Sequence, residues 1–282
     1  DGGRTTRLAD LLQDLDSIDG LDRIRFVTNY PRDMTPELIG AVRDLPKVCQ
    51  YLHVPAQHGS DAVLSRMKRG YTIGEYLEMH ARVREELPRA SVTSDFIVGF
   101  CGETDAEFAT TVDLVERLAF KNSYIFKYSP RPGTKAFDRL PDDVPEEVKK
   151  ERHHVLLDAQ TRASLAGNLP FVGTRQQVLV EGLSTRDEKR GVDPGPDGVA
   201  QLTGHTRCDR IVVFDAPLRL VGRLVDVQID AAGAWSLAGT VADGLADAVP
   251  IPALDERMPG GGAEPPPSLH QIAPPPSRGE PR

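Results

Sequence analysis

The order of apolar runs along the chain limits its possible folds most. From about residue 23 to 170, short runs rich in β-branched and aromatic residues alternate with longer amphipathic segments. The expected strands are 23–28, 49–54, 90–100 and 122–128. Parallel neighbours need a crossover connection, so strands that alternate with helices indicate βαβ units and a parallel sheet. The pattern predicts an α/β domain, either an incomplete (βα) barrel or an open doubly wound sheet.

Helix-start signals support this interpretation. Thr72 with Glu75, and Thr104 with Glu107, have the spacing of a capping box, in which side chain and backbone satisfy each other. The expected helices cover residues 36–45, 61–67, 72–87 and 104–120, followed by a long polar connecting helix over 145–167.

The pattern changes after residue 170. The expected strands 178–183, 210–215 and 224–229 are separated by Gly, Pro and Asp turns without a helical period, which favours a small antiparallel barrel. The last segment is rich in Pro and Gly and is expected to be disordered. We therefore expect three regions: 1–170, 171–240 and 241–282.

Charge and hydropathy exclude some classes of protein. The net charge of −8 argues against a surface that binds nucleic acid everywhere, although a local basic patch remains compatible with it. No apolar run approaches the ~18 residues of a membrane span. The chain starts at Asp1 without a signal sequence, so we expect a cytoplasmic protein that does not contact membranes.

The metal-ligating residue types are scattered. Cys49, Cys101 and Cys208 form neither a disulfide framework nor a metal motif, and isolated thiols are most often buried small hydrophobes. His53 and His58 are five residues apart, a spacing that matches no standard zinc site. The residues therefore predict no metal site.

Three loops follow expected strands, and in α/β folds ligands bind at the carboxyl ends of strands. These loops lie in segments 53–72, 95–104 and 127–136. Gly99 and Gly102 allow the backbone to approach a ligand closely. Arg131 and Lys135 are candidate phosphate contacts at the mouth of the sheet. Each loop taken alone also fits a plain surface turn.

Taken together and in this order, the loops resemble signature blocks of the radical-SAM methylthiotransferases. The blocks are FVTNYPRDMTPELI, PAQHGSDAVLSRMKRGYT, SDFIVGFCGETDAEF and YSPRPGTKA. The resemblance runs from about residue 23 to 240, and the first block together with RGYT favours the MiaB branch. It implies a partial parallel (βα) barrel of the radical-SAM type, with this chain as the C-terminal portion of the enzyme.

The resemblance also implies residues that bind S-adenosylmethionine. Gln57 follows the strand that corresponds to the fourth of the barrel, and Arg69 lies twelve residues later. Ile97, Val98 and Gly99 correspond to the strand edge that contacts the adenine. A guanidinium can pair with the methionine carboxylate, and a glycine lets a ring lie on the backbone.

The family's cluster ligands are missing from this sequence. Its members use a CxxxCxxC loop for the cluster that cleaves S-adenosylmethionine and three further Cys for an auxiliary cluster, and neither set is present. The full-length enzyme would hold two [4Fe-4S] clusters through ligands outside this chain, which alone should be inactive. Cys101 replaces a common Pro before Gly102; we expect packing there, with cluster ligation or sulfur transfer as the alternative.

The second region resembles a TRAM domain, a small RNA-binding barrel, through VLVEGLSTRDEKR, LTGHTRCDRIVVFD and LVGRLVDVQI. Residues 171–240 contain eight Arg or Lys and nine Asp or Glu, a net of −1. Two basic loops are nevertheless candidates for salt-dependent phosphate contacts, and an inert barrel with solvated charges is the alternative. The basic residues are Arg186, Lys189, Arg190, Arg207 and Arg210.

The implied reaction adds a methylthio group to C2 of N6-isopentenyladenosine at position 37 of tRNA. A radical derived from S-adenosylmethionine would abstract the C2 hydrogen, and a methylated sulfur would then be inserted. The implied partner is the anticodon stem-loop, where bases are accessible, and we expect a monomer. The alternatives are the same chemistry on threonylcarbamoyl-adenosine or on a ribosomal-protein aspartate, and a non-catalytic RNA-binding module.

Overall fold

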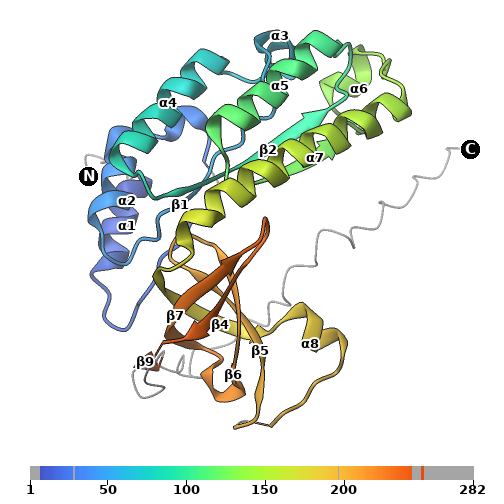
Figure 1. The fold of residues 1–282 in the computed structure, drawn as a ribbon. Coiled ribbons are helices and arrows are strands. Elements are labelled where there is room, and N and C mark those ends of the chain that lie inside the picture. Colours follow the sequence, from blue (N-terminus) through green and yellow to red (C-terminus); the bar gives the residue numbers. More distant parts are fainter. Residues whose placement is uncertain (1–6, 28, 196, 243–248, 251–282) are drawn as a thin grey trace, which may run out of the picture. The chain divides into compact units, whose positions relative to one another are not determined.

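The computed structural model describes residues 7–27, 29–195, 197–242 and 249–250. All of these residues fall within a single compact unit. Most of the segment expected to be disordered, 241–282, lies outside the described residues. The described part contains two sheets, one parallel and one closed into a barrel (Figure 1).

The first sheet is parallel, as predicted. It consists of β1 (Tyr51–His53), β2 (Ser91–Val98) and β3 (Asn122–Lys127), in the order β1-β2-β3. The strand expected over 23–28 is reduced to a single parallel bridge between Ile24 and Val48. Just beyond this segment, the Asn29 N–H donates to the His53 carbonyl.

The helices agree closely with the sequence pattern. All five expected helices are present, with ends within two residues of the expected ones, and both capping boxes form. The helices are α1 (Leu8–Asp16), α2 (Pro36–Asp44), α3 (Asp61–Arg66), α4 (Ile73–Glu86), α5 (Asp105–Leu118), α6 (Lys135–Arg139) and α7 (Glu146–Asn168), with 3₁₀ turns η1 (Pro31–Asp33) and η2 (Leu169–Phe171). The short helices α1 and α6 were not predicted.

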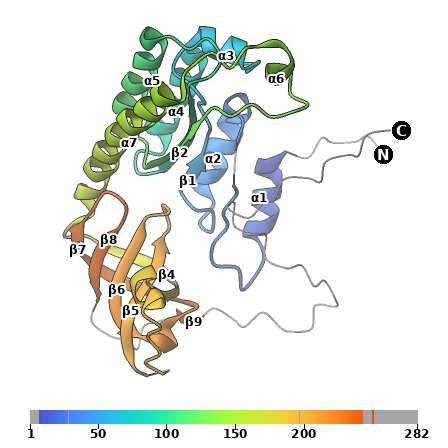
Figure 2. The same ribbon diagram turned by 90° about the vertical axis from the view of Figure 1, so that its right-hand side faces the viewer.

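Helices α4, α5 and α7 lie on one face of the parallel sheet (Figures 1 and 2). Alternate side chains of a strand point to opposite faces, and those of β2 toward the core are Val92, Phe96 and Val98. The opposite face carries the exposed rings of Tyr124 and Phe126 from β3. Only one face of the sheet is therefore sealed by helices.

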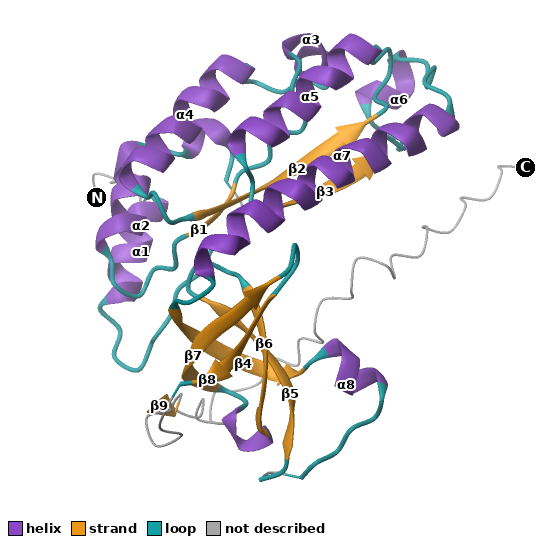
Figure 3. Cartoon of the chain, in the orientation of Figure 1, coloured by secondary structure: helices purple, strands orange, loops and turns teal. Residues whose placement is uncertain are grey.

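The second sheet closes on itself in the order β4-β5-β6-β8-β7, with β7 pairing back to β4 (Figure 3). Its strands are β4 (Arg175–Leu183), β5 (Val199–Thr206), β6 (Ile211–Pro217), β7 (Arg223–Ala232) and β8 (Leu237–Val241), with β9 (Val249–Pro250) added to β7, and with helix α8 (Thr185–Lys189) and turn η3 (Leu218–Leu220) in its loops. The expected all-antiparallel barrel needs one correction, because β6 and β8 pair in parallel. β6 and β8 are not consecutive in the chain and become neighbours only because the barrel closes. No hairpin joins them, so they need not run antiparallel.

Candidate functional site

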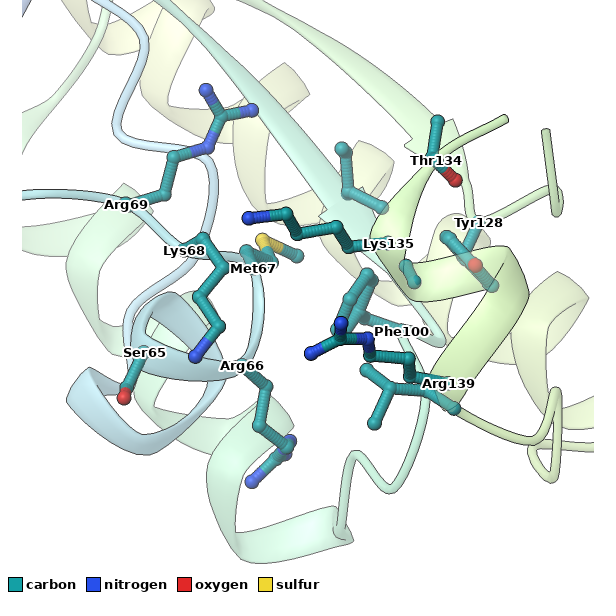
Figure 4. Close-up of a pocket in the computed structure, with 13 residues that line it drawn as sticks. Ser65, Arg66, Met67, Lys68, Arg69, Phe100, Tyr128, Thr134, Lys135 and Arg139 are labelled. Carbon is teal, nitrogen blue, oxygen red and sulfur yellow. The ribbon is translucent and has the colours of Figure 1, made fainter. Parts of the chain in front are cut away.

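A cavity of about 510 Å³ lies at the carboxyl ends of β2 and β3, and a second of about 400 Å³ adjoins it. Arg69, Ile97 and Tyr128 line both. The larger cavity is also lined by Ser65, Arg66, Met67, Lys68, Phe100, Thr134, Lys135, Ala136, Arg139 and Leu140 (Figure 4). Parts of three of the loops that the sequence singled out thus meet at one site.

The end of helix α3 positions Arg69. The Lys68 N–H donates to the Ser65 carbonyl (3.0 Å), and the Arg69 N–H donates to the Leu64 carbonyl (2.9 Å). With Lys68 at φ 58°, this is the Schellman pattern that ends a helix in the left-handed region. It directs the next residue away from the helix, and the Arg69 side chain reaches the cavity without an ion pair among the described residues.

The residues after Arg69 join this turn to the loop that follows β1. The Tyr71 hydroxyl donates to the carbonyls of Pro55 and Ala56, both at 3.1 Å. Burial raises the pKa of Tyr71 to about 12, so this hydroxyl remains a donor at neutral pH. Gly70 leaves room for Tyr30, whose hydroxyl oxygen would lie 2.6 Å from an added Cβ.

Gln57 is held through its backbone. Its N–H donates to the Asp95 carbonyl (2.8 Å), and its carbonyl accepts from the Ile97 N–H (2.9 Å). Its φ of 67° is uncommon for a residue with a side chain, and such strain persists where surrounding structure enforces it. The Gln57 side chain is buried and does not line either cavity. Its backbone bridge instead fixes Ile97, which lines both cavities.

Val98 and Gly99 do not line either cavity. The Val98 side chain is buried in the core of the sheet. Gly99 has φ +71°, and an added Cβ would lie 2.3 Å from Cγ of Lys149 on α7. This glycine therefore lets α7 pack against the turn, whereas the sequence suggested an open edge for adenine. Of the predicted edge, the structure brings only Ile97 to the cavity wall.

A buried carboxylate shapes the turn after β2. Glu103 Oε2 accepts from the N–H groups of Gly99 (2.7 Å) and Phe100 (3.1 Å), while Oε1 accepts from Arg152 Nη1 (3.0 Å). His58 Nε2 lies 3.3 Å from Glu103 Oε2. The Glu103 and His58 side chains are fully buried, so this network ties the turn to the loop that contains Gln57.

Two aromatic residues that the sequence did not single out form the apolar wall. Phe100 and Tyr128 meet edge to face with ring centroids 4.8 Å apart. Burial, above all, raises the pKa of Tyr128 to about 12. Tyr128 directly follows β3, so the rule that ligands bind at the carboxyl ends of parallel strands could have indicated it as well. Cys101 is buried beside Phe100 and Val63, as expected for a packing residue.

The larger cavity has a positive lining. It includes five cationic side chains and no Asp or Glu: Arg66, Lys68, Arg69, Lys135 and Arg139. Arg66 is paired with Glu107 (2.9 Å), which lowers the pKa of that carboxyl to about 2. The other four have no ion pair within the described part of the chain. Arg131 lines the adjoining cavity, so the two residues predicted at the mouth of the sheet, Arg131 and Lys135, both lie at these cavities. The excess of positive charge favours an anionic ligand.

No metal site is formed by the described residues. Among them, no three or more His, Cys, Asp or Glu side chains are grouped so that they could hold an ion. The three cysteines are free and buried apart from one another. Within the same ranges, no helix has the length and apolar character needed to cross a membrane.

The candidate RNA-binding residues of the barrel fall into two groups. Arg186 and Lys189 lie on helix α8, and Arg190 follows it; all three are exposed. Arg207 and Arg210 instead make intramolecular contacts.

Arg207 donates to the carbonyls of Pro46 and Val48 (3.1 Å to Val48). Arg210 is buried, donates to Asn168 Oδ1 (2.9 Å) and lies over the Phe171 ring at 4.3 Å. Burial lowers the pKa of Arg210. This differs from the expectation of free loop cations, because both side chains attach the barrel to preceding elements.

Comparison with known proteins defines the class. Residues 2–115 match the protein family described as the Radical SAM superfamily. Residues 2–115 are thus similar to a radical SAM domain, and the parallel α/β fold is compatible with this similarity.

Closer relatives share one name. The chain is 56% identical over 236 residues to the tRNA-2-methylthio-N(6)-dimethylallyladenosine synthase of Rhodopirellula baltica, covering 84% of this chain and 49% of that protein. It is 42% identical over 241 residues to the synthase of the same name from Acetivibrio thermocellus, covering 86% and 48%. The predicted resemblance to MiaB-type enzymes is confirmed, and the chain spans about half the length of the curated relatives it matches.

Among solved structures, the Escherichia coli radical SAM enzyme coproporphyrinogen III oxidase aligns with a TM-score of 0.41 and 14% identity, over 63% of this chain and 45% of that one. A likeness this distant adds no weight to the assignment.

Proposed function

We propose that this chain is part of a tRNA methylthiotransferase that adds a methylthio group to C2 of N6-isopentenyladenosine at position 37. The observation that supports this proposal most is the 56% identity to a synthase named for this product. The similarity covers 236 residues and therefore includes both sheets. The cavity at Arg69 supports it independently, because its chemistry suits the cofactor of that reaction.

The residues at the cavity fit S-adenosylmethionine. A volume of about 510 Å³ is in the range of small-molecule sites. The Arg69 guanidinium is placed to pair with the methionine carboxylate, and Ile97, Phe100 and Tyr128 offer apolar surface to the adenosyl group. Gln57 fixes Ile97 through its backbone, and Gly99 lets the turn pack under α7. When bound, this cofactor supplies the methyl group and the radical chemistry.

The described residues do not fit an iron–sulfur cluster, since no suitable set of ligands is grouped among them. We propose that the two [4Fe-4S] clusters of the full-length enzyme are held by residues outside this chain. The role that the described residues support is to bind and orient S-adenosylmethionine and the RNA.

The closed barrel is proposed to be a TRAM-like RNA-binding domain over 171–240, following the radical-SAM region over 1–170. The cations on and after α8, namely Arg186, Lys189 and Arg190, are exposed and suited to phosphate contacts. The partner would be the tRNA anticodon stem-loop, whose unpaired bases can be reached by an enzyme. The protein would act as a cytoplasmic monomer.

Nucleoside analysis of tRNA tests the proposal. In a strain that lacks the gene, the 2-methylthio derivative of N6-isopentenyladenosine should disappear and N6-isopentenyladenosine should accumulate. An unchanged level of the methylthio nucleoside would overturn the proposal. Loss of a methylthio group from threonylcarbamoyl-adenosine, or from a ribosomal-protein aspartate, would assign the chemistry to a different target. If no CxxxCxxC motif is encoded in frame before Asp1, the chain is a binding module.

A further inference from the structure

A third cavity, of about 690 Å³, lies at the other end of the parallel sheet. Ala90 and Ser91, at the start of β2, line it, whereas Ile97 near the end of that strand lines the cofactor cavity. At ~3.3 Å per residue, the two sites are roughly 20 Å apart along the strand. We call the third cavity the basic hollow; its remaining lining residues are His80, Arg84, Pro88, Arg89, Arg117, Leu118, Ala119, Lys121, Gly167, Pro170, Phe171, Thr174, Gln176 and Arg210.

The charge of the basic hollow is one-sided. Five cationic side chains line it, and no Asp or Glu does: Arg84, Arg89, Arg117, Lys121 and Arg210. Lys121 is paired at 2.9 Å with Asp209, which also pairs with Arg25. Arg89 and Arg117 are exposed and make no hydrogen bond or ion pair among the described residues. Two guanidinium groups are therefore available to a ligand.

Helix ends explain only part of this charge. Arg84 and Arg117 lie in the last turns of α4 and α5, where a cation complements the helix dipole. Each helix end is equivalent to about half a negative charge, so the two together offset about one cation. With Asp209 offsetting Lys121, about three positive charges remain without a counter-charge, more than capping the two helices requires.

We propose that the basic hollow binds a phosphate group, and that this phosphate belongs to the backbone of the RNA substrate. Guanidinium groups pair with phosphate oxygens, and the apolar residues Leu118 and Phe171 offer surface to a ribose. Such a contact orients the RNA without reading its sequence. The RNA as source rests on the proposed function; the phosphate site rests on the hollow alone.

The test uses the full-length enzyme with Arg89→Ala and Arg117→Ala combined, and an anticodon stem-loop RNA titrated at several salt concentrations. We expect the Kd to rise about 5- to 20-fold and the log–log salt slope to fall by about 1 to 2, as for one or two lost phosphate contacts. The matched control combines Arg43→Ala and Arg162→Ala, which remove the same charge from two ion pairs whose residues do not line the hollow. The control should change the Kd less than twofold.

A second measurement separates the possible sources of phosphate. Inorganic phosphate should raise the Tm of the wild type more than that of the Arg89/Arg117 variant. If only this difference appears, the site binds phosphate from a free compound and the RNA assignment is wrong. If neither the RNA affinity nor the phosphate effect differs, the basic hollow is not a phosphate site. Failure of the wild type to bind RNA at all would count against the proposed function instead.

Discussion

Arg69 shows how one residue acquires a role from local geometry. A Schellman turn ends α3, and the same turn directs Arg69 into the cavity beside Ile97. Its guanidinium has no ion pair among the described residues, so its removal should leave the fold intact.

We expect Arg69→Ala to weaken S-adenosylmethionine binding by the full-length enzyme about 10- to 100-fold, because a hydrogen-bonded charge contributes roughly 1.5–3 kcal/mol. Calorimetric titration measures this Kd. Arg43→Ala, which removes a cation paired with Glu86 away from the cavity, is the control. Equal affinities of the two variants would show that the carboxylate does not bind at Arg69.

Glu103 differs from Arg69, because its side chain is fully buried and its role is structural. Glu103→Ala would leave the buried Arg152 guanidinium without its buried partner, which should cost about 3–5 kcal/mol of unfolding free energy. Urea unfolding measures this loss. Asp105→Ala is the matched control, since that carboxylate also pairs with Arg152 but is 97% exposed. It should cost less than about 1 kcal/mol.

Some of the candidate residues lie at the cavity and others do not, for a physical reason. Arg69, Ile97 and Lys135 meet at the larger cavity because the strand-end rule brings the loops of a parallel sheet together. Gly99 and Arg210 have surroundings that come from distant segments: Lys149 packs on Gly99, and Arg210 lies over the Phe171 ring. A local pattern does not reveal which distant side chain packs on a residue.

At the scale of single elements, helix starts were predicted best, because their signals lie close together in the sequence. The capping boxes at Thr72 and Thr104 depend on residues three apart, and both form. Strands β5 and β8 were not predicted; each contains a glycine, Gly204 and Gly239, that lies close to the backbone of a neighbouring strand. An added Cβ at Gly204 would lie 2.1 Å from the Leu179 carbonyl oxygen, so close contact between strands requires this glycine.

The start of α5 gives a pH-dependent prediction. Hydrogen bonds from Arg66, above all, lower the pKa of Glu107 from 4.5 to about 2 in the folded state. A carboxyl with a lowered pKa stabilises the fold above its unfolded pKa and loses this effect as pH falls. The Tm of wild type should therefore exceed that of Glu107→Gln at pH 7, and the gap should narrow between about pH 4.5 and 2. A gap that stays constant over this range would rule out the ionic contribution.

At the scale of the whole molecule, the basic residues of the barrel differ in their surroundings: those on and after α8 are exposed, whereas Arg207 and Arg210 contact preceding elements. The triple variant Arg186→Ala, Lys189→Ala, Arg190→Ala should weaken binding of an anticodon stem-loop and reduce its salt dependence, because these side chains are exposed. Arg210→Ala should instead lower the Tm, since it removes a buried contact with Asn168. Filter binding and thermal unfolding distinguish the two effects. An unchanged RNA affinity of the triple variant would contradict the first expectation, and an unchanged Tm of Arg210→Ala would contradict the second.

The central claim, that the Arg69 cavity serves tRNA methylthiolation, is tested most directly by complementation. A strain lacking the gene receives the full-length gene with Arg69→Ala or with the control Arg43→Ala, and the methylthio and unmodified forms of N6-isopentenyladenosine are quantified in its tRNA. The account predicts that Arg43→Ala restores the methylthio nucleoside and that Arg69→Ala, at equal protein level, leaves most of the N6-isopentenyladenosine unmodified. Equal restoration by both variants would contradict it.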